Sequence, residues 1–151
     1  MRLVIQRVTN AEVAVPAEGY SSSIGHGLLV LAAFCDEDTP ADLEWCARKL
    51  VAMRIFDDQD GVMNLSVQDV DGEILIVSQF TLFASTVKGN RPSYIKAAKP
   101  EIAVPLYEEF MKMVEAQMGK KVGRGIFGAD MKVSLVNDGP VTIIVDSKLK
   151  F

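Results

Sequence analysis

The Gly139-Pro140 step is the feature of this sequence that most constrains the fold, because it lies between two runs of strand-forming residues. One run covers residues 131–136 and the other covers residues 141–145. Proline lacks the N–H group that a sheet ladder requires, so it occurs at sheet edges, turns and bulges. On residue types alone the pair predicts a hairpin turn. The alternative is a rigid backbone device, with a cis Gly-Pro peptide, that presents two carbonyl oxygens to a ligand.

A second unusual feature is a group of polar side chains inside an apolar run. Residues 74–77 are all apolar, and Ser78, Gln79, Phe80 and Thr81 follow them directly. Buried hydroxyl and amide groups are costly unless they are paired, so such a break marks a hydrogen-bond network or a binding site. The segment on its own favours neither of these two interpretations.

Length and composition predict one globular domain covering residues 1–151. Hydrophobic residues make up 49% of the chain and charged residues 24%, and no apolar run approaches the roughly 20 residues that span a membrane. The first residues lack a signal-peptide pattern, so we expect a cytoplasmic protein with no membrane partner. Cys35 and Cys46 have no metal-ligand spacing and are expected to be free thiols. His26 is the only histidine, so we expect no metal site and no cofactor.

The fold class that these patterns predict is α+β, with two principal helices on a mainly antiparallel or mixed, barrel-like sheet. Thr39-Pro40 opens the first helix in the expected order, a cap and then proline at the first helical position. The second helix begins near Pro100 and ends at Gly119. Alternation and apolar runs predict the strands 2–8 and 11–15 as a hairpin, 27–34, 73–83, 122–127, 131–136 and 141–145.

Taken together, these motifs resemble those of a known family. The motif around Gly139-Pro140 and the segment 78–82 occur with Gln6-Arg7-Val8 and with the stretch 127–131. The chain resembles the D-aminoacyl-tRNA deacylases of the widespread bacterial and eukaryotic type from Met1 to about Ser147. This resemblance implies that the protein is a homodimer. It also implies that the protein binds the 3′ acceptor end of aminoacyl-tRNA and has no DNA partner.

Ester hydrolysis usually requires a nucleophile with an adjacent base, or a metal-bound water. The sequence offers no histidine pair and no Gly-x-Ser-x-Gly elbow. The resemblance implies a site of backbone groups, in which the 2′-hydroxyl of the terminal ribose helps to activate water. The amides of Phe80 and Thr81 are then the expected oxyanion donors, Gln79 positions substrate or water, and Ser78 hydrogen-bonds within the pocket. Two alternatives stay open: a hydrolase with Thr81 as nucleophile, and a non-catalytic domain that binds RNA or a small molecule.

The resemblance also implies a role for the Gly139-Pro140 step. Its carbonyl oxygens would hold the substrate ammonium group, so that a D side chain points to open space and an L side chain strikes the protein. Glycine, which has no side chain, would pass this filter. In the dimer this loop would enter the partner's site. Arg7 is similar to the family arginine that steadies the loop, and a surface salt bridge is its alternative role.

The net charge of the chain limits the size of any surface that could bind RNA. The net charge is -4 and the isoelectric point is about 5.0, which argues against a large nonspecific nucleic-acid surface. The segment 86–100 differs, with four basic residues and no acidic one, and is either a solvated loop or a phosphate-contacting rim. Ala97 and Ala98 align with the family region that lines the terminal adenosine pocket. Met131, at the end of the stretch 127–131, is also expected to bind substrate.

Overall fold

The strand β1 (Arg2–Val15) organises the fold, because it pairs with three other strands. In the computed structural model, which describes residues 1–151, its first half is antiparallel to β3 (Gly27–Ala33) and its second half to β2 (Tyr20–Ile24). β8 (Lys132–Asp146) is antiparallel to β1 along the opposite edge. β1 therefore has hydrogen-bonded neighbours on both sides over most of its length.

The predicted hairpin between residues 2–8 and 11–15 is wrong, because these residues form one continuous strand. Thr9 and Asn10 lie where the hairpin turn was expected, and neither is a glycine or a proline. The chain bends there instead of reversing, and the register against β8 shifts twice between Gln6 and Asn10. Such irregularities absorb a bend and increase local twist without ending a strand.

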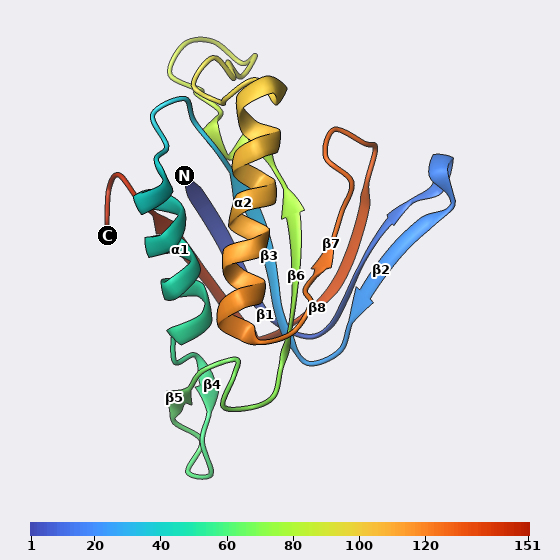
Figure 1. Ribbon diagram of the computed structural model, residues 1–151, viewed down its shortest axis with the longest axis vertical. Coiled ribbons are helices and arrows are strands. Elements are labelled where there is room, and N and C mark those ends of the chain that lie inside the picture. Colours follow the sequence, from blue (N-terminus) through green and yellow to red (C-terminus); the bar gives the residue numbers. More distant parts are fainter.

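The rest of the sheet is built on β3. β6 (Glu73–Ser78) is parallel to β3, and β7 (Gly123–Arg124) is parallel to β6. The resulting mixed sheet has the order β2-β1-β3-β6-β7, with β8 on the other edge of β1, and it curls into a nearly closed barrel (Figure 1). β4 (Phe56–Asp57) and β5 (Met63–Leu65) form a separate two-stranded ladder. The short 3₁₀ helix η1 (Pro16–Glu18) joins β1 to β2.

Four other predicted strands differ from the structure. The expected strand 122–127 is reduced to the two residues of β7, and the expected strand 73–83 ends at Ser78. A 3₁₀ helix, η2 (Phe80–Phe83), follows it. The runs 131–136 and 141–145 are not two strands joined by a hairpin turn, because both belong to β8 and pair with β1 in the same direction.

Both predicted helices are confirmed at the expected positions. α1 (Pro40–Ala52) follows Thr39, whose N–H group and hydroxyl both donate to the carboxylate of Asp42. α2 (Pro100–Met118) ends at Gly119, which has a φ of +70°. Neither α1 nor α2 combines the length and the apolar character that a membrane-spanning helix requires.

Figure 1 shows the two helices side by side on one face of the sheet. The larger hydrophobic core lies between this face and the helices, and includes the buried side chains Leu3, Ile5, Leu28, Val30, Ile74, Ile76, Leu43, Leu50, Phe110 and Val114. A smaller core fills the inside of the barrel on the other face, and includes Val8, Ala11, Val13, Ile24, Leu29, Leu75 and Val77. Cys35 and Cys46 are free, as predicted, and both are buried.

Candidate active site

The site begins where β6 stops pairing with β3. Gln79 N–H donates the last hydrogen bond of this ladder, 2.7 Å to the carbonyl of Ala32, and the chain then turns into η2. Leu82 N–H donates back to the carbonyl of Gln79 at 3.1 Å. The N–H groups at the start of a helix have no acceptor inside it, and here these belong to Phe80 and Thr81. Two free N–H donors, those of Phe80 and Thr81, therefore lie at the end of the strand β6.

A cavity of about 280 Å³ lies between this strand end and the segment that leads into β8. It is lined by Val77, Ser78, Gln79, Phe80, Gly128, Ala129, Asp130, Met131 and Val133. Phe80 is 54% exposed, so part of its ring is open to a ligand in the cavity. Met131 packs on the bare backbone of Gly125, where a Cβ atom would lie 2.5 Å from its sulfur. The structure thus brings together four of the residues predicted for the site: Ser78, Gln79, Phe80 and Met131.

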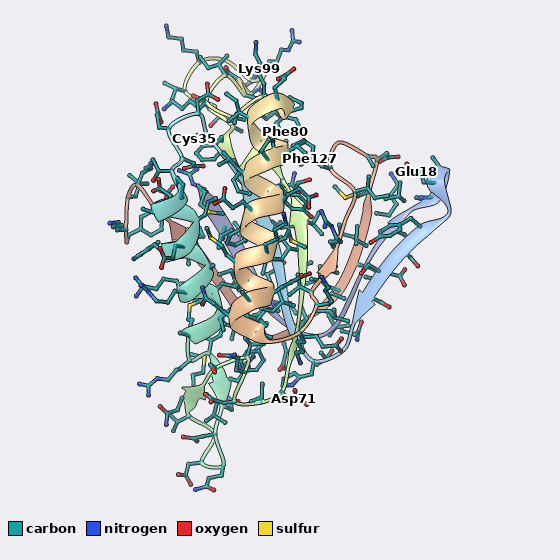
Figure 2. All side chains as sticks on the ribbon, viewed as in Figure 1. Glu18, Cys35, Asp71, Phe80, Lys99 and Phe127 are labelled. Atoms are coloured by element: carbon teal, nitrogen blue, oxygen red, sulfur yellow. The ribbon has the colours of Figure 1, made fainter.

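Of the two alanines predicted to bind substrate, Ala98 lines a space at the site and Ala97 does not. A small hollow next to the cavity is lined by Ser78, Gln79 and Phe80 again, together with Ala32, Ala33, Phe34, Ala98, Ala103 and Phe127. Ala98 N–H donates to the carbonyl of Phe34 at 2.9 Å, which fixes it there. Ala97 lines neither space. Figure 2 shows Phe80 and Phe127 at the upper end of α2, beneath the loop that carries Lys99.

The hydroxyl of Thr81 has no hydrogen bond to a carboxylate or an imidazole. The side-chain amide of Gln79 donates a hydrogen bond to Thr81 Oγ1, so the hydroxyl oxygen acts as an acceptor. His26 comes just before β3, whereas η2 adjoins the far end of that strand at Ala32. Six residues of strand separate the two positions, roughly 20 Å at the usual rise. The only imidazole of the chain is therefore out of reach.

Two other ionisable side chains near the site have structural contacts. Burial raises the pKa of Tyr107 to about 12, and its hydroxyl donates to the carbonyl of Ile76 at 3.1 Å. It is therefore neutral at physiological pH and anchors α2 to β6. Asp130, at the rim of the cavity, pairs with Lys132 at 2.9 Å. No group of three or more His, Cys, Asp or Glu side chains is placed to hold a metal ion.

The Gly139-Pro140 step lies in a bulge of β8, and its peptide is cis. Val8 pairs with Asn137 and Gln6 pairs with Thr142, so residues 138–141 have no partner in the ladder. The side-chain amide of Asn137 donates at 3.0 Å to the carbonyls of both Arg7 and Val141, which closes the base of the bulge. Sequence reasoning did not assign this role to Asn137, although an Asn at the start of a turn-like segment indicates local backbone bonding.

The buried side chain of Arg7 binds the backbone of the bulge. Its Nε donates to the carbonyl of Asp138 at 3.1 Å, and its Nη1 donates to that of Ile55 at 2.8 Å. It also faces the carboxylate of Asp57 at 3.3 Å. Gly139 has a φ of +121°, and a Cβ atom there would lie 2.9 Å from Arg7 Nη2. The guanidinium and the glycine backbone are therefore in close contact.

Within one chain the bulge and the cavity are apart. Arg2 Nη1 donates to the carbonyl of Leu82 in η2, and Arg2 pairs with Asp146 of β8. Thr142, next to the bulge, pairs with Gln6, four residues further along β1. Four residues of strand span roughly 13 Å. The bulge thus lies in the middle of the β1–β8 pair, away from the end of β1 where Arg2 contacts η2.

Comparison with known proteins decides the family. A family profile described as "D-Tyr-tRNA(Tyr) deacylase" matches residues 4–146. The chain belongs to this family. Two D-aminoacyl-tRNA deacylases are similar to this chain over nearly its whole length. The one from Flavobacterium johnsoniae is 60% identical to it and the one from Bacteroides thetaiotaomicron is 57% identical. The alignments cover 98% and 99% of both chains, respectively. Membership of the D-Tyr-tRNA(Tyr) deacylase family makes this chain an ester-hydrolysing enzyme, as predicted.

Two solved structures share the fold of this deacylase family. One, named "c-Myc DNA Unwinding Element Binding Protein", is 41% identical, has a TM-score of 0.89 and aligns over 97% of this chain and 98% of its own. The other is described as a "probable eukaryotic D-amino acid tRNA deacylase". It is 20% identical over 95% of this chain and 97% of its own, with a TM-score of 0.82, and it supports the fold only.

Proposed function

We propose that this chain hydrolyses the ester bond of D-aminoacyl-tRNA, releasing the free D-amino acid and the tRNA. The observation that carries this proposal is the cavity at the end of β6, which is lined by Ser78, Gln79 and the half-exposed Phe80 at the start of η2. Family membership supports the reaction class. Aminoacyl-tRNAs are made and used in the cytoplasm, so we place the reaction there.

In this proposal the amides of Phe80 and Thr81 stabilise the developing oxyanion of the ester. Preorganised backbone donors in a site that excludes water lower the barrier for such charge. Gln79 positions the substrate or the attacking water, and Ser78 hydrogen-bonds within the cavity. The 2′-hydroxyl of the terminal ribose assists the water, which is consistent with a Thr81 hydroxyl that is hydrogen-bonded to Gln79 and not to a base. Met131 contacts the substrate from the wall of the cavity, and Ala98 contacts it from the adjoining small hollow. Ala97 supports the loop beside them.

We further propose a homodimer in which the bulge of one subunit completes the cavity of the other. The separation of roughly 13 Å along β1 between Gln6, beside the bulge, and Arg2, beside η2, supports this arrangement, and no residue of the bulge lines the cavity of the same chain. β8 is an edge strand, and its exposed apolar side chains Val133, Val136 and Ile144 offer a surface for a second copy.

Chiral selection follows from the same arrangement. The carbonyls of Asp138 and Val141 are taken by Arg7 and Asn137, whereas those of Gly139 and Pro140 lie outside the ladder. We propose that these carbonyls accept hydrogen bonds from the substrate ammonium group. With ammonium and ester fixed, an L side chain meets the backbone and a D side chain does not, so L-aminoacyl-tRNA is spared. Glycyl-tRNA is also a substrate on this account.

The deciding experiment measures amino acid release from tRNA charged with D-tyrosine, L-tyrosine or glycine. We expect rapid release of D-tyrosine and of glycine, and release of L-tyrosine no faster than without protein. A second nucleic-acid function, suggested by the DNA-binding name of the 41% identical structure, has its own readout. Binding of tRNA or DNA with no release of D-tyrosine would replace the deacylase by a binding module.

A further inference from the structure

A second and larger cavity, of about 570 Å³, lies beside η2 at the same end of the molecule as the catalytic cavity. It is lined by Arg2, Cys35, Asp36, Glu37, Phe83, Ile95, Lys96, Asp146, Lys148 and Leu149. We call it the η2 groove. Figure 2 shows Cys35, on one wall of the groove, on the other side of α2 from Phe127, close to the loop that ends at Lys99. The proposed deacylase reaction leaves this groove without a role.

The helix η2 connects the groove to the catalytic cavity. Phe80 lines the catalytic cavity, and Phe83 lines the groove. Residues three apart on a 3₁₀ helix lie above one another, roughly 6 Å apart along the axis. An extended single strand of RNA spaces its nucleotides by a comparable distance. Two neighbouring nucleotides can therefore occupy the two spaces, one beside each phenylalanine.

The wall of the groove offers a flat surface suited to a base. The guanidinium of Arg2 lies over the ring of Phe83, with Cζ at 5.0 Å from the ring centroid. Two hydrogen bonds of 2.8 Å hold the guanidinium there, one to the carboxylate of Asp146 and one to the carbonyl of Leu82. Aromatic rings and arginine planes are the surfaces on which proteins stack unpaired bases.

The charged side chains of the groove that have no ion-pair partner indicate the chemistry of its ligand. Arg2 is paired with Asp146, and Lys148 is paired with Asp42 outside the groove. Lys96, Asp36 and Glu37 are exposed and have no ion pair. Two free carboxylates beside one free ammonium disfavour a bare phosphate. They favour a ligand that combines one phosphate with a hydrogen-bond donor on a planar ring.

We propose that the η2 groove binds the cytidine that precedes the terminal adenosine of tRNA. The carboxylate of Asp36 or Glu37 accepts from the cytosine N4 amino group, the usual protein contact for that base. The ring packs on the pair of Arg2 and Phe83, and Lys96 meets the phosphate that links the two nucleotides. This inference rests on the proposed deacylase function, because it assumes that the terminal adenosine occupies the catalytic cavity.

The test compares kcat/KM on three D-tyrosyl substrates. The first is tRNA with its natural 3′ end, and the second has uridine in place of the cytidine before the terminal adenosine. The third is D-tyrosyl-adenosine, which cannot reach the groove. Uracil has an acceptor where cytosine has the N4 donor, so we expect the uridine substrate to be about tenfold worse. D-tyrosyl-adenosine serves as the reference for the catalytic cavity itself.

Two variants and a control complete the test. The double variant Asp36→Asn with Glu37→Gln should lower kcat/KM on natural tRNA about tenfold relative to D-tyrosyl-adenosine, and should lose the preference for cytidine. Lys96→Ala should weaken both tRNA substrates equally and reduce the salt dependence of KM. The control is Lys112→Ala, which removes the same charge from an exposed site on α2 at a distance from η2.

The outcomes separate this inference from the proposed function. Equal rates of the unmodified protein on the cytidine and uridine substrates would overturn the groove assignment and leave the deacylase in place. A higher kcat/KM of the double variant on tRNA would also overturn it, since the carboxylates would then only repel phosphates. Failure of the unmodified protein on both natural tRNA and D-tyrosyl-adenosine would instead remove the deacylase function itself.

Discussion

Arg7 donates a hydrogen bond of 3.1 Å from Nε to the main-chain carbonyl of Asp138, a residue 131 positions later in the chain. The same guanidinium binds the carbonyl of Ile55. A buried arginine thus ties β1 to the bulge of β8 and to the segment before β4. Because both acceptors are backbone atoms, the tie depends on the shape of the guanidinium more than on the acidic residues around it.

Replacing Arg7 should therefore be costly. Arg7→Ala leaves two carbonyls without their donor, and we expect the free energy of unfolding to fall by about 1–3 kcal/mol. We also expect a reduced ratio of D-tyrosine to L-tyrosine release, because the bulge loses its support. Urea unfolding and deacylation assays measure the two effects. Arg48→Ala, at an exposed position of α1, is the matched control and should change neither.

Arg7→Lys separates charge from geometry. Lysine keeps the positive charge near Asp57 but lacks the planar fork that reaches two carbonyls at once. Stability should recover in part, whereas the ratio of D to L rates should stay low. A full recovery of both quantities would mean that Arg7 acts only as a charge.

Gly139→Ala should distort the bulge for two reasons, the positive φ of this residue and the lack of space for a Cβ atom. The new Cβ atom would lie 2.9 Å from both Arg7 Nη2 and Val141 Cγ2, at a φ of +121°. Gly61→Ala is the matched control, because Gly61 also has a positive φ, of +75°, but open space around it. Both variants should lose stability, by about 1–3 kcal/mol for the strained backbone. Only Gly139→Ala should reduce hydrolysis of D-tyrosyl-tRNA, and equal activity of the two variants would contradict the role of the bulge.

Thr81→Ala should keep most of the activity, with kcat reduced by less than about tenfold. Loss of a true nucleophile costs on the order of a million-fold in a serine hydrolase. Single-turnover deacylation measures the difference, and Thr86→Ala, an exposed threonine of the following loop, is the control. A loss of the larger size in a folded protein would establish Thr81 as the nucleophile.

The companion prediction removes the 2′-hydroxyl of the terminal ribose while keeping the D-tyrosyl ester at the 3′ position. Turnover should fall sharply, because this hydroxyl replaces the missing protein base. Binding of the modified tRNA, measured by competition, should change little. Unchanged turnover would contradict assistance by the RNA.

Val136→Asp should produce a monomer with low activity. Val136 is 52% exposed on the edge strand β8, and a carboxylate there disfavours pairing with a second copy. Light scattering gives the mass, and the deacylation rate gives the function. Val62→Asp is the control, because Val62 is 57% exposed but lies between β4 and β5. A monomeric Val136→Asp protein with full activity would show that one chain forms a complete site.

Acid should destabilise the protein partly through Asp42. Burial raises the pKa of this carboxyl, but hydrogen bonds from Lys148 and Thr39 outweigh burial and hold the pKa well below its ordinary value of 3.8. The stabilisation is therefore present above about pH 4 and is lost as the pH falls below it. The drop in melting temperature between pH 7 and pH 3 should be smaller in Asp42→Asn. An identical drop would mean that other carboxylates account for the whole effect.

The sequence predicted those elements whose ends are encoded locally. Thr39-Pro40 and Gly119 place the helix ends, since caps act through neighbouring backbone groups. Thr9 and Asn10 carry no such information, because whether a strand reverses or bends there depends on partners far along the chain. The bulge at Gly139-Pro140 is a similar case, since a hairpin turn and a bulge share residue types and differ only in pairing.

The site could be predicted in part for the same reason. Ser78, Gln79 and Phe80 stand out because polar groups interrupt an apolar run, and the structure places them around one cavity with Met131. The distance between this cavity and Gly139 could not be predicted, because it depends on the register of β8 against β1. The η2 groove was also missed, since its lining comes from five separate parts of the chain.

The position of β1 between two sets of hydrogen-bonded neighbours has a consequence for motion. Amide hydrogens of such a strand exchange only when a large part of the molecule opens, whereas an edge strand opens at lower free energy. Arg7 belongs to the protected strand, and the bulge that it holds belongs to the edge strand β8. We therefore expect the amide hydrogens around the bulge to exchange faster than those of Arg7 and its neighbours in β1.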